Sequence, residues 1–202
     1  MQKVIIVQFT EDPEAVLQFR FLARQLWEEH IGYTRDCIIE MIGGLAGSSV
    51  TVDRLMKNQE DIGSLLTPYY GANASSKLTS LLKEHIRLVG ILVTAIQSGT
   101  ATEIDTATVN ATTNAGDISK LLESLDPMSW PANVVLDLLS KHLGCTVMQA
   151  TSRKNADWLA DIAAADECRA NIYQIADAMA TGILAKYPDM FVIRSAPIVV
   201  NR

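Results

Sequence analysis

The chain has 202 residues, of which 49% are hydrophobic and 20% charged, so it can bury a sizeable core as one domain or two small ones and is not disordered throughout. Its net charge of −6 comes without any Lys/Arg cluster, which argues against a nucleic-acid partner. No run reaches the roughly 18 uncharged apolar residues of a membrane span, so we expect a soluble protein with no membrane partner.

The two ends of the chain are rich in Val and Ile, most clearly over residues 3–9 and 191–200. This composition predicts short extended tails at residues 1–10 and 191–202, which would pair with each other or with a partner. That partner would be a second copy of the chain, giving a homo-oligomer, or another protein. The apolar run at residues 4–7 is too short for a signal-peptide core, so we expect a cytoplasmic protein.

Helix signals dominate between the tails. Asp12 followed by Pro13 is typical of a helix start, because the carboxylate caps free backbone N–H groups and proline suits the first helical position. Apolar residues then recur at three- and four-residue steps from 16 to 41, and Gly43-Gly44 marks the end.

Similar start and stop signals divide the rest of the chain into five further helices. These are expected at about residues 51–68, 73–99, 102–124, 129–151 and 155–186. The predicted fold class is therefore all-α, with about six helices.

One pattern occurs three times along the chain. Residues 26–31, 81–86 and 138–143 share the order apolar, apolar, polar, polar, His, apolar, and they contain all three histidines, His30, His85 and His142. A second pattern occurs at residues 61–66 and again at 117–122, and residues 171–176 match it more weakly. These matches predict a single helical domain over residues 1–202, with three internal repeats at about 12–70, 74–124 and 129–187. Each repeat would be a helical hairpin, and the three would form one bundle or two fused bundles.

The histidines are the main candidates for chemistry. Each occupies a position in an apolar stripe, and a buried imidazole needs partners for its nitrogens. A transition metal, such as Zn or Fe, would satisfy His30, His85 and His142 together if their helices share an axis. Helical rise places a carboxylate near each histidine across its hairpin, as an additional ligand or as an acceptor that orients the imidazole. The candidates are Asp61, Asp117 and Asp166, the last favoured by rise over Asn171.

Two other readings of the same residues stay open. Duplication also copies core residues, so each histidine could bond privately to its own hairpin. The protein would then be a structural or protein-interaction helical module without chemistry. Enzymatic use of a bound metal would need an open coordination position, which the sequence does not show, so no catalytic residue is assigned.

The cysteines, Cys37, Cys145 and Cys168, are odd in number and form no C-x-x-C motif. We therefore expect no disulfide framework and interpret them as small buried apolar side chains.

Several short motifs resemble a group of uncharacterised all-helical bacterial proteins. They are L-W-x-x-H-x-x-x-T-R at residues 26–35, P-Y-Y-G at 68–71 and L-L-x-E-H at 81–85, with G-I and Y-P near the end of the last helix. The resemblance covers most of residues 26–191 and implies an all-helical fold without an established activity. A looser similarity is to DinB-like helix bundles with a three-histidine metal site, although this chain lacks their paired histidines on one helix.

Overall fold

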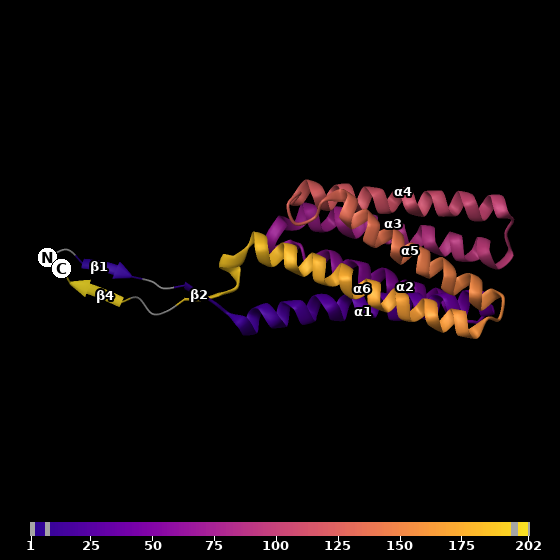
Figure 1. Ribbon diagram of the computed structural model, residues 1–202, viewed down its shortest axis with the longest axis horizontal. Coiled ribbons are helices and arrows are strands. Elements are labelled where there is room, and N and C mark those ends of the chain that lie inside the picture. The colour runs from indigo at the N-terminus through magenta and orange to yellow at the C-terminus, as the bar shows by residue number, and fades with distance from the viewer. Residues whose placement is uncertain (1–2, 7–8, 195–197, 202) are drawn as a thin grey trace.

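The computed structural model describes residues 3–6, 9–194 and 198–201 and is an all-α bundle with a strand ribbon at its ends (Figure 1). This confirms the predicted fold class, and the six helices form one bundle. They are α1 (Pro13–Gly43), α2 (Ser48–Ser64), α3 (Thr67–Ser98), α4 (Ala101–Leu125), α5 (Ala132–Lys154) and α6 (Trp158–Lys186). Within the described residues, no helix combines the length and hydropathy needed to cross a membrane.

The helix ends follow the local sequence in most places. The Asp12 carboxylate accepts from the N–H groups of Glu14 and Ala15 at the start of α1, and Gly44 ends that helix in the left-handed region at φ 62°. At α4, Thr100 and Glu103 form a reciprocal capping box.

The start of α6 differs from the prediction, and that of α3 only in part. The α3 span begins at Thr67 because a short helical stretch comes before the main helix, and the two meet at a kink where Gly71 adopts non-helical angles (φ 80°, ψ 170°), just before the predicted start near Asn73. The cap of α6 is Asp157, whose side chain accepts from the N–H of Ala160, rather than Asn155.

The six helices are arranged as an inner triangle and an outer layer. Helices α1, α3 and α5 contact one another, while α2 packs between α1 and α3, α4 between α3 and α5, and α6 between α5 and α1. The elongated bundle that results is visible in Figure 1. Since each histidine lies on an odd-numbered helix, this arrangement brings all three histidines towards the centre.

The apolar core is divided along the bundle axis. On α3, residues up to Leu82 belong to the main hydrophobic cluster, and residues from Leu88 belong to a second one, with His85 between them. In the main cluster Trp130 packs against Gly182, where an added Cβ would lie 2.5 Å from the indole nitrogen. Glycine is therefore required there by close approach, not by backbone conformation.

The tails pair with each other, as predicted. Strand β1 (Lys3–Ile6) runs antiparallel to β4 (Ile198–Asn201), and β2 (Phe9–Glu11) runs antiparallel to β3 (Val192–Arg194). A short 3-10 turn, Pro188–Met190, links α6 to β3. The ribbon leads away from the bundle, and β1 and β4 lie together at its tip (Figure 1).

Candidate functional site

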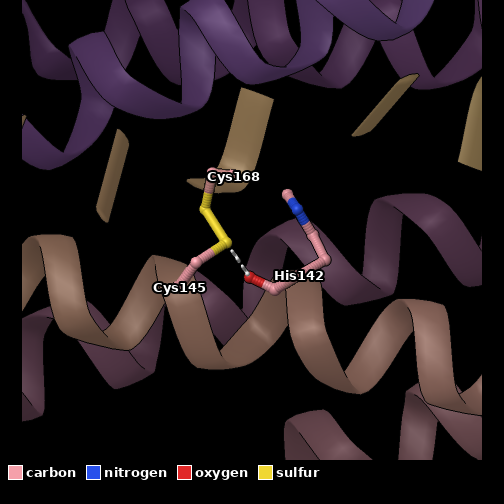
Figure 2. Close-up of side chains that lie close together, drawn as sticks. All are labelled: His142, Cys145 and Cys168. Atoms are coloured by element: carbon pink, nitrogen blue, oxygen red, sulfur yellow. Dashed lines mark hydrogen bonds between the residues drawn. A yellow bond between two sulfur atoms is a disulfide. The ribbon is translucent and has the colours of Figure 1, made fainter. Parts of the chain in front are cut away.

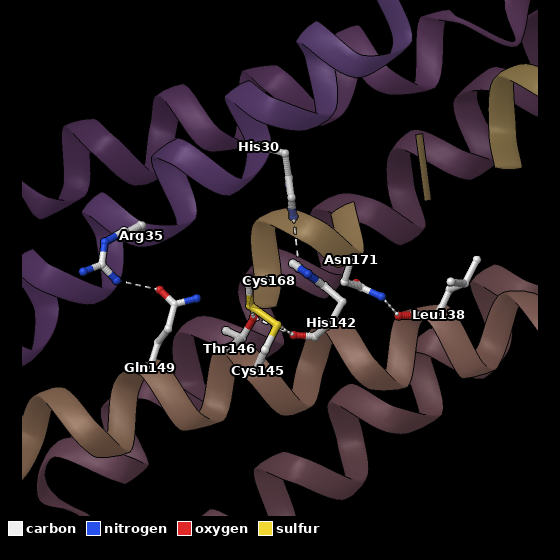
Figure 3. Close-up of a disulfide and its surroundings, with 9 residues drawn as sticks. All are labelled: His30, Arg35, Leu138, His142, Cys145, Thr146, Gln149, Cys168 and Asn171. Atoms are coloured by element: carbon white, nitrogen blue, oxygen red, sulfur yellow. Dashed lines mark hydrogen bonds between the residues drawn. A yellow bond between two sulfur atoms is a disulfide. The ribbon is translucent and has the colours of Figure 1, made fainter. Parts of the chain in front are cut away.

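The three histidines form a buried polar layer inside the bundle. His30, His85 and His142 are only 3%, 5% and 4% exposed. The Nε2 atoms of His30 and His142 face each other at 3.4 Å, across the contact between α1 and α5 (Figure 3). His85 is close enough for its charge to affect the pKa of both other rings.

The same hydrogen bond fixes each histidine-bearing helix to its partner. In each hairpin, an asparagine of the second helix donates its side-chain N–H to the carbonyl of a leucine four residues before the histidine. The pairs are Asn58 to Leu26 (2.9 Å), Asn114 to Leu81 (3.1 Å) and Asn171 to Leu138 (3.2 Å). The two residues of each pair are 32, 33 and 33 positions apart, so the hairpins share one register at the level of the histidines.

Side-chain amides from the second helix of two hairpins contact the Nδ1 atoms of the histidines. Asn114 Oδ1 lies 2.9 Å from His85 Nδ1, and Gln59 Nε2 lies 3.2 Å from His30 Nδ1. A carbonyl oxygen can only accept, so His85 carries its proton on Nδ1 and presents an unprotonated Nε2.

Several buried polar atoms at this level have no hydrogen-bond partner. They include His142 Nδ1, Asn171 Oδ1 and Gln59 Oε1. An unsatisfied buried donor or acceptor costs roughly 1–3 kcal/mol. The layer is therefore not a fully satisfied set of private hydrogen bonds.

Burial keeps all three imidazoles neutral. Loss of solvation lowers the pKa of His142 to about 3, with a smaller contribution from the charge of His85. The pKa of His30 lies well below its ordinary value, first because of burial and then because of repulsion from His142 and His85. Burial also lowers the pKa of His85, although its bond to Asn114 opposes the shift. Neutral imidazole is the form that binds metal ions.

The predicted carboxylates do not join the histidines, and this part of the prediction is wrong. Asp61 pairs with Lys57 and Asp117 with Lys120 at the surface, while Asp166 is exposed. The residues that reach the histidine level lie three positions earlier in the first two hairpins, at Asn58 and Asn114. A three-residue step moves a side chain along the helix and around it, which is enough to take it out of the interior.

The third hairpin shows that the second halves of the repeats were matched to one another at the wrong positions. Asn171 corresponds to Asn58 and Asn114 by its hydrogen bond, not to the two aspartates against which its segment was matched. Helical rise alone does not fix rotation about the helix axis, which is why it favoured Asp166. The signal that would have found these residues is an asparagine 28 or 29 positions after each histidine.

Two of the cysteines are also placed differently from the prediction. Cys145 on α5 and Cys168 on α6 form a disulfide, with their Cα atoms 5.5 Å apart, whereas Cys37 is free and buried (Figure 3). Their spacing of 23 positions carries no known motif. They meet because the antiparallel hairpin brings one turn of α5 opposite one turn of α6.

A neighbouring ion-pair cluster holds α1 against this hairpin. Arg35 donates to Gln149 and to the buried carboxylate of Asp161, which also accepts from Arg153. Figure 3 shows the Arg35–Gln149 bond, with Gln149 on the same helix as Cys145 of the disulfide. These bonds fix the separation of α1 and α5, and with it the spacing of His30 and His142.

One group of three residues has all its candidate ligand atoms within 4.8 Å of one another, considering the described part of the chain alone. It consists of His142, Cys145 and Cys168, all of them buried (Figure 2). His30, His85 and His142 do not form such a group, so His85 would have to move closer to the other two rings to share an ion, and their ligation of one ion stays a prediction. Comparison of the chain with protein-family models, curated proteins and solved structures finds no match.

Proposed function

We propose that this helix bundle binds one transition-metal ion, Zn or Fe, through the Nε2 atoms of His30, His85 and His142. The observation that carries the proposal is the approach of two buried, neutral imidazoles through Nε2 at 3.4 Å, while His85 is near enough for its charge to lower the pKa of both rings. Two nitrogens bound at 2.0–2.1 Å to one tetrahedral ion would lie about 3.3–3.4 Å apart. The site therefore already has the spacing of two ligands.

The surrounding amides support the same proposal. Metal-bound histidines nearly always donate from their second nitrogen to an acceptor, which fixes the ring and raises its basicity. Asn114 Oδ1 accepts in this way from His85. Asn171 Oδ1 is an unused acceptor in the hairpin of His142, whose Nδ1 is an unused donor.

His30 has to change its proton position when the ion binds. Gln59 Nε2 can only donate, and besides His30 Nδ1 at 3.2 Å it contacts the Leu55 carbonyl and Asn58 Oδ1 with its two hydrogens, so the imidazole proton lies on Nε2, facing His142. Ligation through Nε2 would move that proton to Nδ1, and the unpartnered Gln59 Oε1 would accept it only if the amide rotated and gave up its bonds to Leu55 and Asn58.

The recurrent Asn-to-Leu bond supports the view that the three hairpins derive from one repeated unit. Each copy places a histidine on an inner helix and a side-chain amide on the outer one. Threefold repetition around the inner triangle of α1, α3 and α5 would then account for one central ion served by three equivalent ligands.

The proposal is tested by metal analysis of untagged protein after reconstitution with Zn²⁺ or Fe²⁺. We expect one ion per chain, a higher melting temperature with the ion, and loss of both effects in His30→Ala, His85→Ala and His142→Ala. Asn114→Ala should weaken binding by about 10- to 100-fold, as expected for loss of a ligand-orienting acceptor. Asn110→Ala, one turn away on the exposed face of α4, is the matched control. Protein that takes up no ion and gains no stability would overturn the proposal.

A second candidate function, a protein-interaction module, is favoured by two surface features. An apolar hollow of about 740 Å³ is lined mainly by α3, including Ile91, and by α4, with Met41 of α1 and Met56 of α2 also in its wall. In the described part of the terminal ribbon each sheet has two strands, so their outer backbone edges are open to pairing with a second copy or another protein. Self-association that disappears when residues 1–10 and 192–202 are removed would support this function, and an unchanged monomer would refute it.

A further inference from the structure

The disulfide lies directly beside one of the proposed metal ligands. Cys145 follows His142 by three residues on α5, and Cys168 faces both from α6. The three side chains are 4%, 3% and 0% exposed in the order His142, Cys145, Cys168. Their candidate ligand atoms lie within 4.8 Å of one another (Figure 2).

The surroundings of the two sulfurs also suit free thiols. The main-chain carbonyl oxygen of His142 lies 3.1 Å from Cys145 Sγ and 3.9 Å from Cys168 Sγ. A disulfide sulfur has no hydrogen to donate, so these contacts become hydrogen bonds only when the cysteines are reduced. The Thr146 hydroxyl, 3.8 Å from Cys168 Sγ, is a further partner for that thiol. Reduction would therefore leave neither thiol without a partner.

We propose that Cys145 and Cys168 are redox-controlled metal ligands, which bind Zn²⁺ together with His142 when reduced and release it when they form the disulfide. The inference goes beyond the function proposed above and stands on its own set of ligands, with His142 as the one residue that the two sites share. Two thiolates and one imidazole are a donor set that zinc prefers, and three protein ligands leave one tetrahedral position open.

The geometry allows this exchange with small movements. With Zn–S bonds of about 2.3 Å and Zn–N bonds of about 2.0–2.1 Å, ligand atoms of one tetrahedral ion lie roughly 3.4–3.8 Å apart. All three residues already fall within the 4.8 Å limit, so the sulfurs need only separate from bonding distance. His142 Nδ1, buried and without a partner, adds an unsatisfied polar atom at the same place.

The chemical steps balance with a peroxide as oxidant. Zinc binding to the two thiols and His142 releases two protons. Oxidation of the bound thiolates by hydrogen peroxide forms the S–S bond, frees Zn²⁺ and, with two protons, yields two molecules of water. A phosphine restores the thiols by taking one oxygen atom from water, which supplies the two protons.

Cobalt absorption tests the inference, because a thiolate bound to Co²⁺ gives a charge-transfer band that nitrogen ligands do not. Protein is reduced with a small phosphine, freed of it without oxygen, and titrated with Co²⁺. We expect the band in the reduced wild type and its loss on adding peroxide. It should be absent from Cys145→Ser/Cys168→Ser. Cys37→Ser, which removes the free buried cysteine, should retain it.

The outcomes separate this inference from the proposed function. Denatured reduced protein should show three thiols and oxidised protein one. Reduced, folded protein without the band overturns the inference, as does a reduced chain that stays unfolded with Co²⁺. If the double serine variant still binds one Co²⁺ through nitrogen, the three-histidine function stands whatever the cysteines do. If only the reduced wild type binds, the thiol site stands and the histidine site fails.

Discussion

Mild acid is expected to destabilise this protein well above the pH at which its carboxylates titrate. His30, His85 and His142 are buried and neutral, and their pKa values lie below the ordinary value of 6.5. The unfolded chain therefore binds protons that the folded chain excludes. Stability is full above about pH 6.5 and is lost as the pH falls towards the folded pKa values.

The size of the effect can be worked out for His142, whose folded pKa is about 3. Each pH unit below 6.5 costs about 1.4 kcal/mol per excluded proton, so His142 alone accounts for roughly 2 kcal/mol at pH 5. The other two histidines add to this loss. Carboxylates with lowered pKa values, such as Glu60 and Asp177, lose their contribution only below about pH 4, outside this range.

Urea unfolding of the metal-free protein between pH 7 and pH 5, with a chelator present, measures this loss. His142→Gln should reduce the pH-dependent loss by about 2 kcal/mol at pH 5, because the substituted side chain does not titrate. Lys141→Gln, at the exposed neighbouring position, should leave the slope unchanged. A free energy of unfolding that is constant over this range, or an unaltered slope in His142→Gln, would refute the argument.

Three further predictions concern stability. Gly182→Ala should lower the free energy of unfolding by about 1–3 kcal/mol, because the new Cβ meets the Trp130 ring. Gly116→Ala, at a position on α4 with open space around it, should raise the free energy of unfolding by about 0.5–1 kcal/mol. Equal effects of the two substitutions in urea unfolding would contradict this. Replacing Cys145 and Cys168 by Ser should cost oxidised protein about 3 kcal/mol through lost loop closure, and a melting temperature identical to that of oxidised wild type would refute it. Asp12→Ala should cost about 1 kcal/mol, because the first turn of α1 loses its cap; unchanged hydrogen exchange and stability would argue against it.

The helices could be predicted from the sequence because their signals are local. Caps such as Asp12 and breaks such as Gly44 act within a few residues of the helix end that they determine. The threefold histidine pattern also predicted which positions would share a level inside the bundle. It succeeded because the inner helices α1, α3 and α5 use the same face for the same packing.

The site could be predicted only in part, because its remaining members depend on rotation about helix axes. Helical rise favoured carboxylates as partners, whereas burial without an ion pair favours neutral amides such as Asn114. The contact between Cys145 and Cys168 depends on the register of one hairpin. A count of cysteines does not contain that information.

The central claim is that His30, His85 and His142 hold one ion at the centre of the bundle. Anomalous scattering from crystals grown with Zn²⁺ tests it most directly. The account predicts one strong peak about 2.0–2.1 Å from Nε2 of both His30 and His142, with His85 as the third ligand. A centre without a peak, with the two Nε2 atoms still in direct contact, would contradict it.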